Sequence, residues 1–139
     1  MGPSSVTDSR DRRAAVLVVD DDASIRRMMI AALKRSNDYE FLEAGNGREA
    51  VDLMRREHPK AVVLDLMMPV MSGFDVLQER AADPVLRRIP VIVVSANRAP
   101  EIATAVDKGI CAFLPKPFDI NVLNALVRSC LASENAGTG

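Results

Sequence analysis

Apolar residues occur along the chain in two patterns, as short continuous runs and as longer stretches with helical spacing. Three runs, at 16–19, 61–64 and 91–94, are apolar at every position. Runs of this kind are typical of strands that are buried on both faces of a parallel sheet. Two weaker candidates, at 39–44 and 112–114, complete the set. The pattern therefore predicts five strands.

The stretches between and after these runs carry apolar residues at helical spacing. The clearest stripe, in the first stretch, comprises Ile25, Met28, Met29, Ala32 and Leu33. The last stretch repeats it with Leu123, Leu126, Val127, Cys130 and Leu131. Residues suited to helix starts are Asn46 with Glu49, Ser72 with Asp75, Pro100, and Asp119. Five strands that alternate with five helices predict βα units and a parallel sheet.

The length of 139 residues suits one domain that has its own hydrophobic core. Both ends are rich in small and polar residues, which bury too little apolar surface to become ordered. We therefore expect mobile tails at 1–13 and 133–139 on either side of a folded domain at 14–132.

Composition and charge exclude several classes of protein. The 18 basic and 19 acidic residues give no excess of positive charge that would favour nucleic-acid binding. No apolar run approaches the roughly 18 residues that a membrane span needs, and the first residues do not resemble a secretory signal. Cys111 and Cys130 are far apart in the sequence and are interpreted as small buried or half-buried thiols. We expect a soluble protein of the reducing cytoplasm that contacts no membrane.

Polar residues stand at the ends of four predicted strands. They are Asp20, Asp21 and Asp22, then Asp65, Ser95 and Lys116. Ligands of open α/β sheets bind beyond the carboxyl ends of the strands. If the sheet is doubly wound in the flavodoxin-like order 2-1-3-4-5, these residues meet at one edge. A single Asp in such a position is more often a turn former or a helix cap, but the position that all of them share favours a common site.

Clustered carboxylates repel one another unless a cation neutralises them, so the arrangement implies a bound metal ion. Carboxylate oxygens without histidine or thiol ligands favour Mg²⁺, or Mn²⁺, over zinc. The single histidine, His58, precedes Pro59 in a predicted loop and is expected to be exposed.

Four motifs occur in a fixed order along the chain. They are VLVVDDD at 16–22, DLMMPVMSG at 65–73, VSA at 94–96 and FLPKPF at 113–118. With these motifs the stretch from 14 to 131 resembles the receiver domains of two-component response regulators, including the single-domain chemotaxis-type regulators. One motif alone is a weak signal, whereas four at these spacings are a strong one.

The resemblance implies that Asp65 accepts a phosphoryl group from a phosphohistidine on a sensor histidine kinase or a phosphotransfer protein. Asp21, Asp65 and the backbone carbonyl of Met67 would hold Mg²⁺ directly, and Asp20 would act through a water molecule. Phosphoryl transfer needs an in-line nucleophile and cations near the equatorial oxygens, and little other covalent chemistry. Such a chain is a signalling domain that catalyses only its own phosphorylation and dephosphorylation.

The resemblance also implies a switch. Lys116 would pair with the Asp65 carboxylate and then with the phosphoryl oxygens, and Ser95 would hydrogen-bond one of those oxygens. The ring of Phe113 would follow Ser95 and change the surface of the fourth helix, fifth strand and fifth helix. An unidentified downstream protein, or a second copy in a phosphorylation-dependent homodimer, would bind there. Phe113 stands where the family often has Tyr, and Ile110 where a small Ala is usual.

Other positions would shape the site. Ala96 would leave room for the phosphoryl group, and Gly73 would permit a sharp start of the third helix. The resemblance also implies a cis peptide bond before Pro117. Met67 and Asn97 flank the path of the hydrolytic water and would modulate the lifetime of the phosphoryl group. Because Met67 cannot orient a water molecule, we expect slow dephosphorylation.

Two other functions are compatible with parts of the pattern. The sequence DDDAS at 20–24 mimics the motif of haloacid-dehalogenase-like phosphotransferases, in which Asp20 would be the nucleophile. Those enzymes need an acidic pair after a later strand, but only Asp119 and Glu134 follow Lys116. The second alternative is a receiver-like module that binds partners without being phosphorylated.

Overall fold

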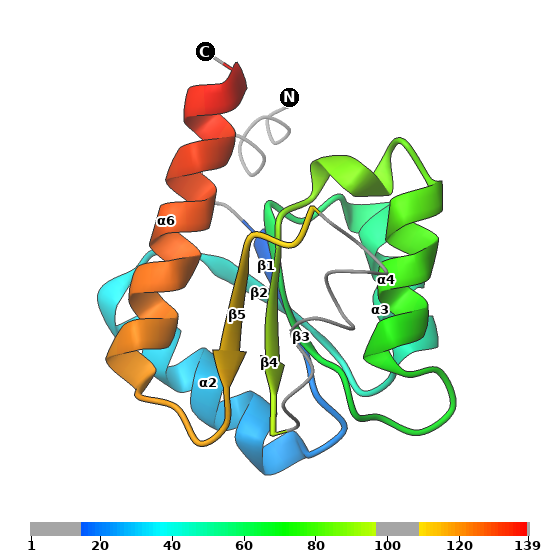
Figure 1. Cartoon of the computed structure of the whole chain (residues 1–139). Coiled ribbons are helices and arrows are strands. Elements are labelled where there is room, and N and C mark those ends of the chain that lie inside the picture. Colours follow the sequence, from blue (N-terminus) through cyan, green and yellow to red (C-terminus); the bar gives the residue numbers. More distant parts are fainter. Residues whose placement is uncertain (1–14, 97–108, 139) are drawn as a thin grey trace, which may run out of the picture.

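The computed structural model describes residues 15–96 and 109–138, which form a parallel sheet with helices on both faces (Figure 1). All five predicted strands are present, in the order β2-β1-β3-β4-β5. Every neighbouring pair is parallel. The strands are β1 (Ala15–Val19), β2 (Glu40–Ala44), β3 (Ala61–Asp65), β4 (Val91–Ser95) and β5 (Ala112–Pro115). The doubly wound fold predicted from the sequence is confirmed.

Helices cover the two faces of the sheet in pairs. Helices α2 and α6 lie on one face, and α3 and α4 lie on the other (Figure 1). The helical segments are α2 (Ala23–Ser36), α3 (Gly47–Glu57), α4 (Gly73–Ala82), the 3₁₀ turn η1 (Leu86–Arg88) and α6 (Ile120–Thr138). The helix expected to begin at Pro100 lies outside the described residues.

The core is divided by the sheet into two apolar clusters. Alternate residues of β1 show the division, because Leu17 and Val19 belong to the cluster under α3 and α4, whereas Val16 and Val18 belong to the cluster under α2 and α6. Alternation of this kind follows from the two-residue period of a strand. The central strands are therefore apolar at every position because both of their faces are buried.

Side-chain caps begin the helices where the sequence predicts. The Ser72 side chain and Asp75 form a capping box at α4, and the Asn46 side chain accepts a hydrogen bond from the backbone N–H of Glu49 at α3. Asp119 accepts from the N–H of Asn121 at the start of α6. The last Asp of the DDD motif has the same role, because Asp22 accepts from two N–H groups in the first turn of α2.

Two expectations about helices need correction. Helix α6 continues to Thr138, so the C-terminal tail expected at 133–139 was placed too early. Backbone hydrogen bonds can extend a helix beyond its last apolar residue once a packed segment has nucleated it. Met28, assigned to the apolar stripe of α2, is 50% exposed. The N-terminal tail expected at 1–13 lies outside the described residues.

The interpretation of the two cysteines as separate thiols is wrong. Cys111, just before β5, and Cys130, in α6, are joined by a disulfide. Their separation of 19 residues along the chain gave no sign of this contact. The pairing follows from the fold, because α6 packs back against β5 and brings the two Cα atoms to 6.2 Å.

Candidate functional site

Parallel strands in register bring the predicted site residues to one edge of the sheet. Asp65 pairs with Val94 across β3 and β4, and Ser95 pairs with Pro115 across β4 and β5. Asp20 directly follows β1, which neighbours β3. The strand ends thus gather as the 2-1-3-4-5 order predicts.

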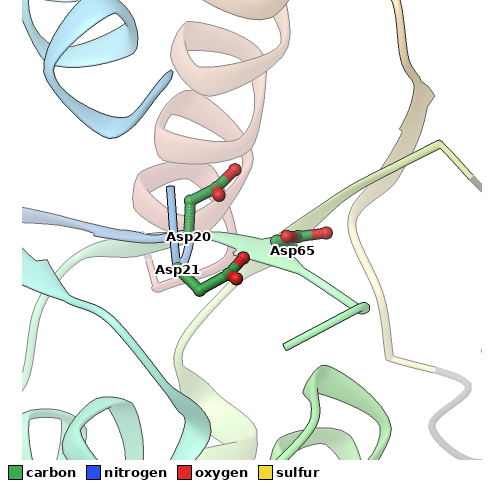
Figure 2. A group of neighbouring side chains, drawn as sticks. All are labelled: Asp20, Asp21 and Asp65. Atoms are coloured by element: carbon green, nitrogen blue, oxygen red, sulfur yellow. The ribbon is translucent and has the colours of Figure 1, made fainter. Parts of the chain in front are cut away.

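Three carboxylates form the centre of the site. Asp20, Asp21 and Asp65 each offer an oxygen atom, and these atoms lie within 4.8 Å of one another (Figure 2). Asp20 and Asp65 are buried, with 1% and 5% exposure, whereas Asp21 is exposed. A cluster of oxygen donors that opens to solvent on one side fits Mg²⁺, which retains several water ligands when it binds to proteins.

Each buried carboxylate has one oxygen held by the backbone and the other near Lys116. Asp20 Oδ1 accepts from the N–H of Asp22 at 2.9 Å, and Asp65 Oδ1 accepts from the N–H of Met67 at 3.2 Å. The Lys116 ammonium lies 3.0 Å from Asp20 Oδ2 and 3.8 Å from Asp65 Oδ2. Lys116 therefore lies closer to Asp20 than to the expected partner, Asp65.

Backbone contacts position Lys116. Its N–H donates to the carbonyl of Ser95 at 2.9 Å, and the bond between Lys116 and Pro117 is cis, as predicted. The β4–β5 pairing thus continues to the residue that carries the ammonium. The side chain of Lys116 is only 19% exposed, so its charge acts in a poorly hydrated environment.

The protonation of Asp65 is sensitive to its surroundings. The pKa of Asp65 is raised from 3.8 to about 6, chiefly by burial and to a smaller extent by the Asp20 and Asp21 carboxylates. The Lys116 ammonium and the N–H of Met67 act in the opposite direction and lower the pKa. A divalent cation among the three carboxylates would also favour the ionised form of Asp65.

Gly73 allows the chain to pass directly behind the acceptor. A Cβ at this position would lie 2.4 Å from the carbonyl oxygen of Asp65 and 2.6 Å from the Cα of Leu66. The N–H of Gly73 donates to the carbonyl of Leu66 at 3.0 Å. The prediction that glycine is needed at the start of this helix is supported, and close backbone approach is the reason.

The remaining predicted residues surround this centre. Ser95 is fully buried at the end of β4, while Ala96 and Met67 are exposed at the mouth of the site. Phe113 and Ile110 are partly buried and pack against the core cluster under α3 and α4. Asn97 lies outside the described residues.

One cation beside the site was not predicted. Arg26, on α2, donates from Nη1 to the carbonyl of Asp20 at 2.7 Å and forms an ion pair with Glu43 at 2.7 Å. Its position four residues after Asp22, in the first turns of α2, resembles that of any exposed helical arginine, so the sequence offered no signal for this contact.

A shallow groove adjoins the site. Its lining comprises Ile25, Met28, Ala96, Lys116, Pro117 and Phe118. The exposed side chain of Met28 thus belongs to a surface that also includes Lys116.

In the part of the chain that the structure describes, no helix combines the length and the apolar character required to cross a membrane.

Comparison with known proteins agrees with the geometry. Relatives include "Response regulator Rre1" of Synechocystis, 34% identical over 89% of this chain and 54% of the relative. Another is "Probable transcriptional regulator ycf27" of Porphyridium aerugineum, 36% identical over 86% of this chain and 49% of the relative. The chain thus spans about half the length of these curated relatives. The solved receiver domain of Francisella response regulator 1452 has a TM-score of 0.78, with 27% identity over 87% of this chain and 98% of that one. The family model for the response regulator receiver domain matches residues 16–128, and the chain belongs to this family of two-component signalling domains.

Proposed function

We propose that this receiver domain accepts a phosphoryl group on Asp65 from a histidine kinase or a phosphotransfer protein. The observation that carries the proposal is the buried Asp65 carboxylate, set among two further carboxylates and the Lys116 ammonium at the strand ends. A nucleophilic anion, an oxygen-lined cation site and a fixed positive charge are the parts that phosphoryl transfer requires.

In the proposed reaction an oxygen of Asp65 attacks the phosphorus atom in line with the phosphorus–nitrogen bond of the donor histidine. That bond breaks, its electron pair stays on the imidazole nitrogen, and an acyl phosphate forms on Asp65. The Lys116 ammonium, which lies near both Asp20 and Asp65, would pair with a phosphoryl oxygen. The buried Ser95 hydroxyl, at the end of the adjacent strand, would hydrogen-bond another.

The donor set of the site suits Mg²⁺, or Mn²⁺ in its place. Asp21, Asp65 and the backbone carbonyl of Met67 would hold the ion directly, and Asp20 would act through a water molecule. The bound ion would neutralise the charge of the carboxylates and of the incoming phosphoryl oxygens.

Phosphorylation would then change the surface of β5 and its flanking helices. A dianion beside Ser95 would draw its hydroxyl inward, and the ring of Phe113, which is partly buried on β5, would follow. We propose a cytoplasmic protein whose changed surface binds a downstream protein or a second copy of this chain. Curated relatives of about twice this length include one named as a transcriptional regulator. That name supports transcription control as an output of a partner domain, and we propose that the receiver itself binds no nucleic acid.

The test is incubation with acetyl phosphate and Mg²⁺, followed by intact mass measurement and mapping of the modified peptide. We expect one added phosphoryl group, located on Asp65, and none in Asp65→Asn. Asp52→Asn, on the exposed surface of α3, is the matched control and should incorporate phosphate normally.

Three other results would contradict the proposal. Incorporation that persists in Asp65→Asn would reassign the acceptor. A modified peptide that contains Asp20 instead would favour the haloacid-dehalogenase-like mechanism. No incorporation in any variant, despite Mg²⁺ binding, would favour a module that only binds partners.

A further inference from the structure

The two cysteines of the chain connect the last strand to the last helix. Cys111 precedes β5 and Cys130 lies in α6, and the disulfide between them closes a loop with a sequence separation of 19 residues. Because the chain contains only these two cysteines, no other intramolecular disulfide can form. The bond therefore creates a defined two-state element, oxidised or reduced.

We propose that Cys111 and Cys130 form a reversible redox modification site that controls how firmly β5 is held against α6. The reagent would be a thiol or disulfide of low molecular weight, or a dithiol oxidoreductase. The consequence of this control for signalling rests on the proposed function, whereas the redox chemistry itself does not.

The two cysteines differ in exposure in a way that suits exchange. Cys111 is an exposed residue, whereas Cys130 is 2% exposed and belongs to the apolar core cluster under α2 and α6. An external thiolate can therefore approach the disulfide from the Cys111 side. Exposed disulfides are the more readily reduced class and include the regulatory ones.

Each step of the exchange is balanced. In reduction, an external thiolate attacks Cys111 Sγ, the disulfide breaks, and Cys130 leaves as a thiolate that takes a proton. A second external thiolate then releases Cys111 and forms the external disulfide. In oxidation, the Cys111 thiolate attacks an external disulfide, and Cys130 resolves the mixed disulfide. Two thiols of the protein are then oxidised, and one external disulfide is reduced to two thiols.

Other contacts would keep β5 and α6 in place after the disulfide is reduced. The N–H of Cys111 donates to the carbonyl of Val91 at 2.8 Å, which holds the start of β5 to β4 without any help from the disulfide. Helix α6 is anchored by the fully buried Leu123 and Val127. Reduction would therefore loosen the contact between β5 and α6 without unfolding the sheet.

The position of the bond gives it a regulatory consequence. Strand β5 carries the partly buried Phe113, and it lies between Cys111 at its amino end and Lys116 at its carboxyl end. The disulfide, at the amino end of β5, restrains the strand and the helix that the proposed switch would move. Oxidation would thus suppress the surface change and leave the carboxylate cluster around Asp65 intact.

The first experiment uses the full chain equilibrated in glutathione buffers of graded reduction potential. The fraction of disulfide is measured by trapping free thiols with N-ethylmaleimide and determining the intact mass. We expect one reversible two-electron transition under native conditions. We also expect the thermal midpoint to fall by about 5–15 °C on reduction, from the loop length and the domain size. Cys111→Ser should lack the redox-dependent shift yet remain folded, and Cys130→Ala provides a second variant that removes the buried thiol.

The second experiment is hydrogen exchange of the unphosphorylated protein in both redox states. We expect faster exchange in β5 and the facing turns of α6 on reduction, and no change in β1 or β3. Equal exchange in both states would overturn the proposal, as would a disulfide that never forms or that is reduced only after denaturation. Because neither experiment involves phosphate, failure of Asp65 to accept a phosphoryl group would count against the proposed function alone.

Discussion

A buried arginine and a half-buried lysine lie at opposite ends of the sheet, and the partners described for them differ in kind. At the amino end of β4 and β5, Arg80 is 3% exposed and donates to backbone carbonyls. Among the described residues, its acceptors include the carbonyl oxygens of Ile89 at 2.9 Å, Arg87 at 3.0 Å and Gly109 at 3.3 Å. At the carboxyl end, Lys116 lies between two carboxylates at 3.0 and 3.8 Å.

The difference separates a permanent contact from an exchangeable one. Backbone carbonyls change neither their charge nor their protonation, so the planar guanidinium of Arg80 joins α4 to two loops in one fixed arrangement. Carboxylates can bind protons, metal ions or a phosphoryl group, and each such event changes the attraction for Lys116. The fold thus has a rigid end and a responsive end.

The largest effect on stability is expected when the rigid end is broken. Arg80→Leu keeps the apolar contacts of the side chain but removes the donors of one buried and two part-buried hydrogen bonds to carbonyl oxygens. We expect a loss of about 3 kcal/mol in the free energy of unfolding, measured by urea titration. Arg56→Ala, at an exposed position on α3, should change the same quantity by less than about 0.5 kcal/mol. A small loss in Arg80→Leu would show that the contacts with the carbonyls are dispensable.

The second effect concerns the cost of a buried carboxylate at the responsive end. Asp65 has its pKa raised from 3.8 to about 6, so its protonated form is favoured in the folded state. Protonation of Asp65 therefore contributes to the free energy of unfolding. This contribution is fully present below about pH 4 and is lost as the pH rises through about 6. The rise in pKa corresponds to about 3 kcal/mol at most.

Asp65→Asn should therefore stabilise the metal-free protein at pH 8, by about 2 kcal/mol, and should have little effect at pH 4. Urea unfolding in the presence of EDTA at the two pH values measures this difference. Added Mg²⁺ should then stabilise the wild type more than the variant. Equal stability of the two proteins at pH 8 would mean that water penetration already relieves the desolvation of Asp65.

These contrasts show which features could be predicted from the sequence. Apolar runs such as 91–94 predict strands that are buried on both faces, and the polar residues that follow these runs then meet at one edge of the sheet. The position of Lys116 near the carboxylates could be predicted for that reason. By contrast, Arg80 has the spacing of an ordinary helical surface residue, and its burial depends on where η1 and the turn before β5 pass.

Contacts between distant parts of the chain could not be predicted either, because they depend on how the elements pack. The disulfide between Cys111 and Cys130 depends on how α6 packs on β5, which no local pattern records. The preference of Lys116 for Asp20 over Asp65 is a matter of about one ångström, which follows from side-chain packing and not from residue type.

A smaller stability effect is expected from the responsive cation itself. Lys116→Met removes the charge and keeps the length of the side chain, at a site that opens to solvent near Asp21. We expect a loss of about 1–2 kcal/mol in stability, less than for Arg80→Leu, because water can reach the carboxylates and Asp65 can take up a proton. Phosphoryl incorporation from acetyl phosphate should fall at least about tenfold. The opposite ranking in stability would show that Lys116 is mainly a structural residue.

The smallest effect is expected in the backbone, where two non-glycine residues of the described part of the chain, one at each end of the sheet, have left-handed conformations. His58 ends α3 with φ 49°, and its N–H donates to the carbonyl of Met54 as part of the helix cap. Val70, in the loop that follows Asp65, has φ 67° and is 85% exposed. A β-branched residue is strained in this region, whereas histidine and asparagine tolerate it better.

Val70→Asn should therefore stabilise the protein by about 0.5–1 kcal/mol, because it relieves the strain and gives up almost no buried surface. His58→Asn should have a smaller effect, because the native residue already tolerates its conformation. Urea unfolding of both variants in the same buffer measures the difference. If Val70→Asn gains no stability but alters phosphoryl incorporation, the strained valine contributes to the geometry of the loop that carries Met67. The responsive end would then depend on its strained backbone as well as on its charges.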